Sequence, residues 1–186
     1  SFQICITIRI GNVRKERLPL LNIFTGPPGY IKMFDDQINT DMMLKCKYEE
    51  NPYEIHAHSF VLSAFSPVFS SMLHGEWTET RTKTINVNEN ISEEVMTIFV
   101  RMFYGATIDP ETFATAAPQL LALSSVYNVK LLGTLCMEWI TKSMSVESAV
   151  NTLLIADRFA AEFPTLKKAA LKFIAVNAED VVEHET

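Results

Sequence analysis

The first ten residues alternate between apolar and polar side chains. The apolar positions are Phe2, Ile4, Ile6, Ile8 and Ile10. Because successive side chains of a strand point to opposite faces, this pattern predicts a half-buried strand. A charged run follows at residues 14–17, and Gly-Pro-Pro-Gly at 26–29 is typical of a turn or linker. We therefore expect residues 1–30 to form a segment that is separate from the domain that follows.

A second alternating segment, residues 41–48, predicts a strand of the main domain. Its apolar face consists of Met42, Leu44, Cys46 and Tyr48. After a turn at 49–52, Tyr53, Ile55 and Ala57 offer their side chains to the same core, which is the pattern of an antiparallel hairpin. We expect a third short strand at residues 84–87.

The remainder of the chain shows helical spacing. Ser92 can cap a helix whose apolar stripe is Val95, Ile98, Phe99, Met102 and Phe103. Further apolar helices are expected at 120–127 and at 132–144. A helix that begins at Ser145 should place Val150, Leu153, Leu154 and Asp157 on its inner side, and a last helix should follow Pro164. Since the strands precede the helices, the predicted fold class is α+β.

Charge and cysteine usage limit the class of protein. The 186 residues carry a formal net charge of −6 without a long Lys/Arg stripe, so we expect no nucleic-acid partner. No apolar run approaches the roughly 18 residues that cross a bilayer, so we expect no membrane span. Cys5, Cys46 and Cys136 lie far apart among apolar neighbours, which predicts free thiols in the cytoplasm or nucleus. The start at Ser1 rather than Met predicts an excised fragment.

The residue types that carry catalysis do not come together in the sequence. There is no Gly-rich phosphate loop, nucleophile elbow or zinc-protease helix pair. His56 and His58 lie close to the strand that contains Cys46, but a zinc site needs three or four convergent ligands and no fourth residue is evident. We therefore expect no enzyme, no cofactor and no metal site.

One continuous segment resembles a known family. Residues 58–72, His-Ser-Phe-Val-Leu-Ser-Ala-Phe-Ser-Pro-Val-Phe-Ser-Ser-Met, resemble the signature of BTB/POZ domains. The likeness extends to Thr40-Asp41, to Phe103-Tyr104-Gly105 and to the segment from Leu120 to Tyr127. The resemblance implies a BTB/POZ domain over residues 31–144, with a small three-stranded sheet capped by helices.

The C-terminal residues are most similar to MATH-BTB proteins. The matching segments are Ser-Val-Glu at 145–147, Ala156-Asp157, Leu-Lys-Lys-Ala-Ala at 166–170, Phe173-Ile174 and Asp180-Val181. This likeness implies that residues 145–186 form a helical extension of the three-box or BACK type. It also implies that residues 1–30 are the end of a MATH domain.

The resemblance further implies a dimeric substrate adaptor for a cullin-3 RING ubiquitin ligase. In cullin-binding members a hydrophobic-x-Glu motif enters a pocket of the cullin, and here Trp77, Thr78 and Glu79 align with it. Tyr127 and Asn128 align with a second cullin-facing position. Each aromatic residue has a structural alternative: Trp77 could pack on its own domain, and Tyr127 could lie at the edge of the core.

Self-association is implied by a second group of residues. Ile31, Met33, Phe34 and Val61 align with the positions that form the homodimer interface in this family. The substrate protein would bind through a domain outside this chain. The alternative is a BTB module that only self-associates, in a transcriptional or cytoskeletal regulator, without contacting cullin-3.

Overall fold

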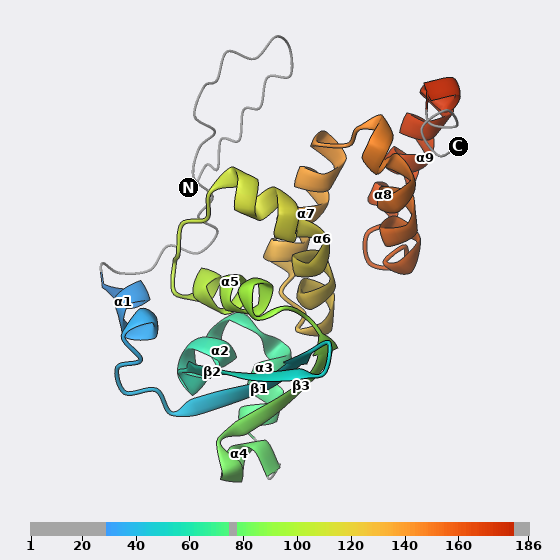
Figure 1. Ribbon diagram of the computed structural model, residues 1–186. Helices are drawn as coiled ribbons and strands as arrows, with labels where there is room; N and C mark the ends of the chain where they lie inside the picture. The colour runs from blue at the N-terminus through green and yellow to red at the C-terminus, as the bar shows by residue number, and fades with distance from the viewer. Residues whose placement is uncertain (1–28, 75–77, 181–186) are drawn as a thin grey trace, which may run out of the picture.

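The computed structural model describes residues 29–74 and 78–180. The strand predicted at residues 2–10, Cys5, Trp77 and the side chain of Thr78 lie outside the described residues. Within these ranges the chain forms a three-stranded sheet and a larger set of helices, so the predicted α+β class is confirmed. In Figure 1 the sheet lies at one end of the molecule, and the helices extend away from it.

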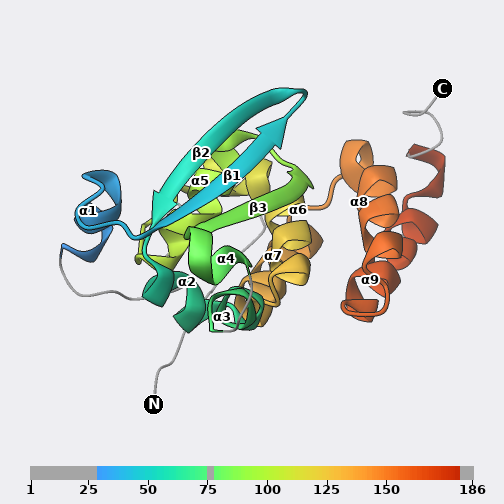
Figure 2. The ribbon, with the colours of Figure 1, turned by 90° about the horizontal axis from the view of Figure 1, so that it is seen from below.

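The sheet has the strand order β2-β1-β3. Strands β1 (Met42–Tyr48) and β2 (Asn51–Ala57) are antiparallel, whereas β3 (Thr84–Asn90) runs parallel to β1. The register pairs Leu44 with Ile55 on one side and with Ile85 on the other. All three of these side chains are buried. The predicted apolar face is therefore the face that packs on the helices (Figure 2).

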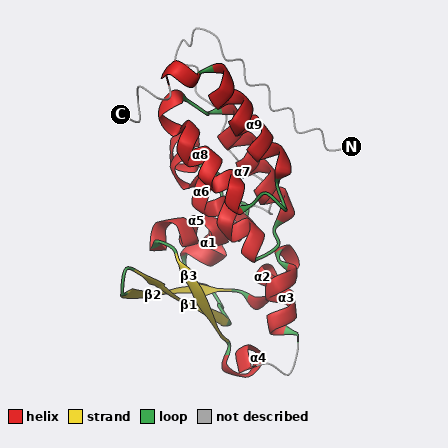
Figure 3. Cartoon of the chain, turned by 90° about the vertical axis from the view of Figure 1, so that its right-hand side faces the viewer, coloured by secondary structure: helices red, strands yellow, loops and turns green. Residues whose placement is uncertain are grey.

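Nine helices lie within the described ranges. They are α1 Tyr30–Asp35, α2 Ser59–Phe65, α3 Pro67–Leu73, α4 Thr78–Thr82, α5 Glu93–Phe103, α6 Pro110–Val126, α7 Lys130–Lys142, α8 Val146–Arg158 and α9 Pro164–Val176. Figure 3 shows α5, α6 and α7 above the sheet, with the α8–α9 pair farthest from it. The core is thus formed between the sheet and the first of these helical layers.

Helix α5 begins and packs as its sequence predicts. The hydroxyl of Ser92 accepts a hydrogen bond from the backbone N–H of Val95, and Glu93 and Glu94 lie in the first turn, where the helix dipole favours them. Seven of its eleven residues are buried. A helix with so many buried positions must be covered on several sides, and α5 occupies the centre of the domain.

Helix α6 is ten residues longer at its N-terminus than the sequence pattern predicts. It begins at Pro110, and the carboxylate of Asp109 caps it by accepting from the N–H of Thr112 at 2.9 Å. Pro118 lies inside the helix and cannot donate to the carbonyl four residues earlier. Buried Ala117 and Leu120, before and after Pro118, hold the helix together through tertiary packing.

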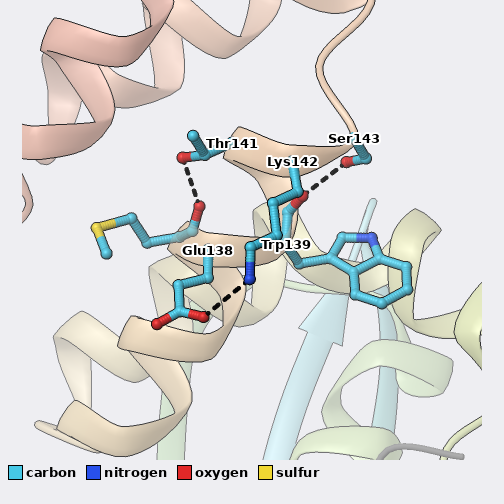
Figure 4. Close-up of polar contacts among 6 residues, drawn as sticks. Glu138, Trp139, Thr141, Lys142 and Ser143 are labelled. Atoms are coloured by element: carbon cyan, nitrogen blue, oxygen red, sulfur yellow. Dashed lines mark hydrogen bonds and ion pairs between the residues drawn. The ribbon is translucent and has the colours of Figure 1, made fainter. Parts of the chain in front are cut away.

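Helix α7 ends in a set of local polar contacts (Figure 4). The Ser143 hydroxyl donates to the carbonyl of Trp139 at 2.9 Å, and Lys142 pairs with Glu138 at 3.3 Å. The backbone N–H of Ser143 also donates to this carbonyl, so Ser143 makes two hydrogen bonds at the last turn of the helix. The Trp139 ring extends to the opposite side, and it meets Phe113 of α6 edge-on at 5.5 Å between centroids.

The inner side predicted for α8 is wrong. The buried residues are Ala149, Thr152 and Ala156, whereas Leu154 and Asp157 are exposed. Small side chains allow α8 and α9 to approach closely, and α9 contributes Leu166 and Ala170 to the same contact. A capping box between Ser145 and Ser148 fixes where α8 begins. The large apolar side chain of Leu154 therefore remains on the surface.

The absence of a side chain at Gly133 of α7 allows the α8–α9 pair to pack closely on the rest of the molecule. A Cβ atom at Gly133 of α7 would lie 2.6 Å from Cζ of Phe163 and 2.8 Å from Oγ of Ser124. Phe163 precedes α9, so its ring occupies the space that Gly133 leaves open. Close contact at this point fixes the position of α9 on α7.

We predict that Gly133→Val lowers the free energy of unfolding by about 1–3 kcal/mol, because the branched side chain must displace Phe163 or Ser124. Urea denaturation followed by circular dichroism measures this change. The neighbouring exposed position offers a matched control, Thr134→Val, which should alter stability by no more than about 0.5 kcal/mol. Equal stability of Gly133→Val and the wild type would contradict the proposed packing.

Candidate protein-interaction surfaces

The segment with the family signature forms the helix pair α2–α3. Asp41, just before β1, accepts hydrogen bonds from the N–H of Ser59 at 2.7 Å and from its hydroxyl at 2.6 Å. Burial opposes ionisation of Asp41, but the hydrogen bonds from Ser59 outweigh it, so its pKa lies below the usual value. The carboxylate thus fixes the start of α2 to the start of the sheet.

Ser66 connects α3 to the turn between α6 and α7. Its buried hydroxyl accepts from the N–H of Phe69, which caps α3, and donates to the carbonyl of Tyr127 at 2.6 Å. Both capacities of this hydroxyl are therefore used inside the protein. The contact places the α6–α7 turn at the N-terminal end of α3, with α4 beyond its C-terminal end.

Tyr127 lies in the core. Its side chain is only 3% exposed, and its ring stacks on Phe69 at 4.4 Å between centroids. The hydroxyl donates to Oε2 of Glu89 at 3.1 Å. Burial, followed by the charge of Glu89, raises the pKa of Tyr127 well above its usual value. Of the two readings of Tyr127, this geometry favours the core edge, and little of the ring is available to a partner.

Other residues of the α6–α7 turn are exposed. Asn128 takes the left-handed conformation, with φ of 53°, and faces solvent. On either side of it, Val126 and Leu131 are 43% and 47% exposed. Glu79 lies in the first turn of α4 and is half-buried. The seven residues of α3 separate these two groups, which is about 10 Å along the helix axis.

The residues predicted for the dimer interface divide into two classes. Phe34 and Val61 are buried in the core of the chain itself, whereas Ile31 and Met33 are half-buried. Two residues that the sequence analysis did not select are more exposed: Phe60 at 53% and Ile38 at 42%.

These side chains surround a cluster of aromatic rings. Tyr30 of α1 meets Phe60 of α2 edge-on at 6.2 Å between centroids, and Phe34 contacts Tyr104 at 5.0 Å. We call Ile31, Met33, Ile38 and Phe60 the α1–α2 patch.

His58, Cys46 and Cys136 serve structural roles. His58 is buried and bonds to Tyr104 and to the carbonyl of Ile38. Within residues 29–74 and 78–180, no three His, Cys, Asp or Glu side chains are grouped as metal ligands. Cys46 and Cys136 are buried free thiols, as predicted, and burial raises the pKa of Cys46 to about 11. No helix in the described part of the chain is long and apolar enough to cross a membrane.

Comparison with known proteins identifies the family. The family model of the BTB/POZ domain matches residues 30–144, which is more than half of the chain. The chain belongs to the BTB/POZ domain family. A BTB/POZ domain is a module for protein–protein interaction, so the predicted interaction function is confirmed at this level.

Two mouse proteins are similar to this BTB/POZ chain. TD and POZ domain-containing protein 4 of Mus musculus is 32% identical over 129 residues, which cover 69% of this chain and 34% of the relative. TD and POZ domain-containing protein 2 of the same species is 30% identical over 153 residues, which cover 81% and 39%. The chain therefore spans about a third to two fifths of the length of these curated relatives.

Sequence reasoning missed the exposed apolar residues of this BTB/POZ domain for one reason. Val126 is the last but one residue of the apolar segment 120–127, and Leu131 directly precedes the stripe that begins at Leu132. Phe60 lies within the signature segment. Apolar residues in such segments are normally assigned to the core. Only the helix orientations reveal which of them face solvent.

For the BTB/POZ domain we predict that Tyr127→Phe costs about 1 kcal/mol of unfolding free energy, because one hydrogen bond is lost. Tyr127→Ala should cost about 3–5 kcal/mol, because it leaves a cavity beside Phe69 and Phe99. Chemical denaturation measures both values. Val126→Ala, one residue earlier and exposed, is the control and should have little effect. If Tyr127→Ala leaves the free energy of unfolding nearly unchanged, the ring lies at the surface rather than in the core.

Proposed function

We propose that this BTB/POZ domain forms a homodimer and links substrates to a cullin-3 RING ubiquitin ligase, in the cytoplasm or nucleus. The observation that carries self-association is the α1–α2 patch. Phe60 and Ile38 are large apolar side chains exposed in the single chain, and the half-buried Ile31 and Met33 lie on the adjoining helix. A two-fold interface needs one self-complementary apolar surface of this kind.

Phe34 and Val61 pack inside the protomer, beneath the side chains of this surface. Both are buried in the chain's own core, so we assign them to holding α1 and α2 in place rather than to contacting a second copy. Phe34 packs on Tyr104, and Val61 lies in the middle of α2. In this proposal the contact residues of the dimer are the four residues of the α1–α2 patch.

The proposed cullin-binding surface follows α3. Glu79 of the motif and the α6–α7 turn lie at its two ends, and Val126, Asn128 and Leu131 offer exposed side chains at the turn. Pro67, Ser71 and His74 are exposed along α3 between them. Because these positions recur at four and three residues, they share one face of the helix.

The C-terminal helices support the adaptor proposal. The segments at 145–147, 156–157 and 166–170 resemble MATH-BTB proteins, and they fall on α8 and α9. We propose that this pair is the three-box extension that enlarges the cullin-binding surface. The similar mouse proteins are named for a TD domain as well as a POZ domain, which is consistent with a substrate domain elsewhere in a longer protein.

We predict that Phe60→Asp shifts the protein from dimer to monomer, with a Kd raised at least about 10-fold, because a charge would be buried without a partner. Sedimentation equilibrium measures the mass. Phe34→Asp is unsuitable, since it would place the charge in the protomer core. The control is Leu154→Asp, at an exposed apolar position on α8, which should leave the dimer intact. A wild-type chain that is monomeric at tens of micromolar would contradict the dimer.

We predict that Trp77→Ala weakens binding to the cullin-3 N-terminal domain by about 30-fold, or roughly 2 kcal/mol, as expected of an aromatic anchor. Leu131→Asp should weaken the same binding, and titration calorimetry measures both. Phe60→Asp, which changes the dimer surface instead, is the control: it should break the dimer and leave the cullin affinity of each protomer unchanged. If the folded dimer binds no cullin-3, the adaptor proposal fails and the self-association alternative replaces it.

A further inference from the structure

A hydrogen-bonded unit of His58 and Tyr104 lies beneath the α1–α2 patch. Nε2 of His58 is 2.8 Å from the carbonyl oxygen of Ile38, and Nδ1 is 2.8 Å from the hydroxyl of Tyr104. The same hydroxyl accepts from the backbone N–H of His58 at 2.9 Å. Both residues are buried. Three separate segments therefore meet here: the turn after α1, the start of α2 and the end of α5.

The chemistry of these groups fixes where the hydrogens lie. A carbonyl oxygen only accepts, so Nε2 of His58 must carry the hydrogen that it donates to Ile38. In the neutral ring Nδ1 is then an acceptor, and the Tyr104 hydroxyl donates to it. Burial raises the pKa of Tyr104 to about 12, so the hydroxyl keeps its hydrogen at neutral pH. Every polar side-chain atom of the pair has a partner, and removing either side chain leaves buried groups unsatisfied.

The turn between α1 and β1 requires such an anchor. Gln37 and Asn39, on either side of Ile38, have left-handed φ values of 50° and 56°. Residues other than glycine adopt this region uncommonly, Asn more often than Gln. Residues in this conformation persist where their surroundings hold them. The Ile38 carbonyl that accepts from His58 lies between these two positions.

Apart from this unit, helix α1 is held mainly by the packing of Ile31 and Phe34 against the core and by its aromatic rings. Its rings Tyr30 and Phe34 both contact Tyr104, at 5.8 Å and 5.0 Å between centroids. Asp35 pairs with Arg101 at 3.2 Å, but both side chains are about two fifths exposed, and such a pair contributes little. A helix of six residues is not stable alone, so its position depends on this contact with Tyr104 and His58.

We propose that His58 and Tyr104 are positioning residues that clamp α1 and thereby build the α1–α2 patch. The consequence for self-association rests on the dimer proposed above. His58 contacts the patch on both sides, at Ile38 after α1 and at Phe60 of α2. Its ring bonds to the carbonyl of Ile38, and its ring centroid lies 5.7 Å from that of Phe60. Loss of the clamp would release α1 while the sheet and α5 keep their own packing.

The test combines hydrogen exchange with sedimentation on three variants. In His58→Phe and Tyr104→Phe, the amides of Met33, Asp36 and Ile38, which bond within α1 and its turn, should exchange at least about 10-fold faster. The dimer Kd should rise at least about 10-fold. His58→Gln keeps a donor within reach of the Ile38 carbonyl and should restore much of both properties. His56→Phe, on the half-exposed position opposite Met43 in β1, is the matched control and should change neither.

The outcomes separate this inference from the proposed dimer. Faster exchange confined to residues 30–40, together with a weaker dimer, supports the clamp. If His58→Phe and Tyr104→Phe leave these amides protected, or if β1 and α5 lose protection to the same degree, the inference is overturned. If the wild type is monomeric, the dimer proposal fails on the sedimentation result alone, whereas the exchange data still decide whether the clamp exists.

Discussion

The burial of α5 is the constraint on which the other elements depend. With most of its residues inside, it must be covered by the sheet and α2 on one side and by α6 on another. Phe99 and Phe103 are fully buried and reach α2, α3 and the α6–α7 turn through the rings of Phe65, Phe69 and Tyr127. The positions of both proposed interaction surfaces follow from this packing.

The two surfaces lie on different parts of the same helix pair. The α1–α2 patch is built around the start of α2, where Asp41 and His58 fix the chain. The proposed cullin surface follows α3, whose start is fixed by Ser66 and Tyr127. Each surface thus has its own buried polar anchor, His58 for one and Ser66 for the other. A dimeric adaptor of the proposed kind would bind a second copy and cullin-3 through separate sets of residues.

How much the sequence predicted depends on the size and spacing of the residues. The hairpin and α5 have large apolar side chains at regular intervals, and their prediction was correct. The start of α6 combines alanines with Pro110 and Pro118, so it carries no clear apolar period although it is buried. In α8 the contact is made by Ala149, Thr152 and Ala156, and a prediction based on large side chains chose the wrong side. At the candidate sites, burial of Phe34 and Val61 depends on helix orientation, which the local pattern does not contain.

The parallel pairing of β1 with β3 has a consequence for synthesis on the ribosome. Parallel neighbours cannot be joined by a tight turn, and here α2, α3 and α4 lie between β2 and β3. While the nascent chain is shorter than residue 90, β1 and β2 can already pair, but the other edge of β1 has no strand beside it. That edge carries unpaired backbone groups next to apolar Met42 and Leu44, a combination that favours pairing with other chains. Until β3 emerges, this edge of β1 is thus a site where the growing chain can pair with another chain.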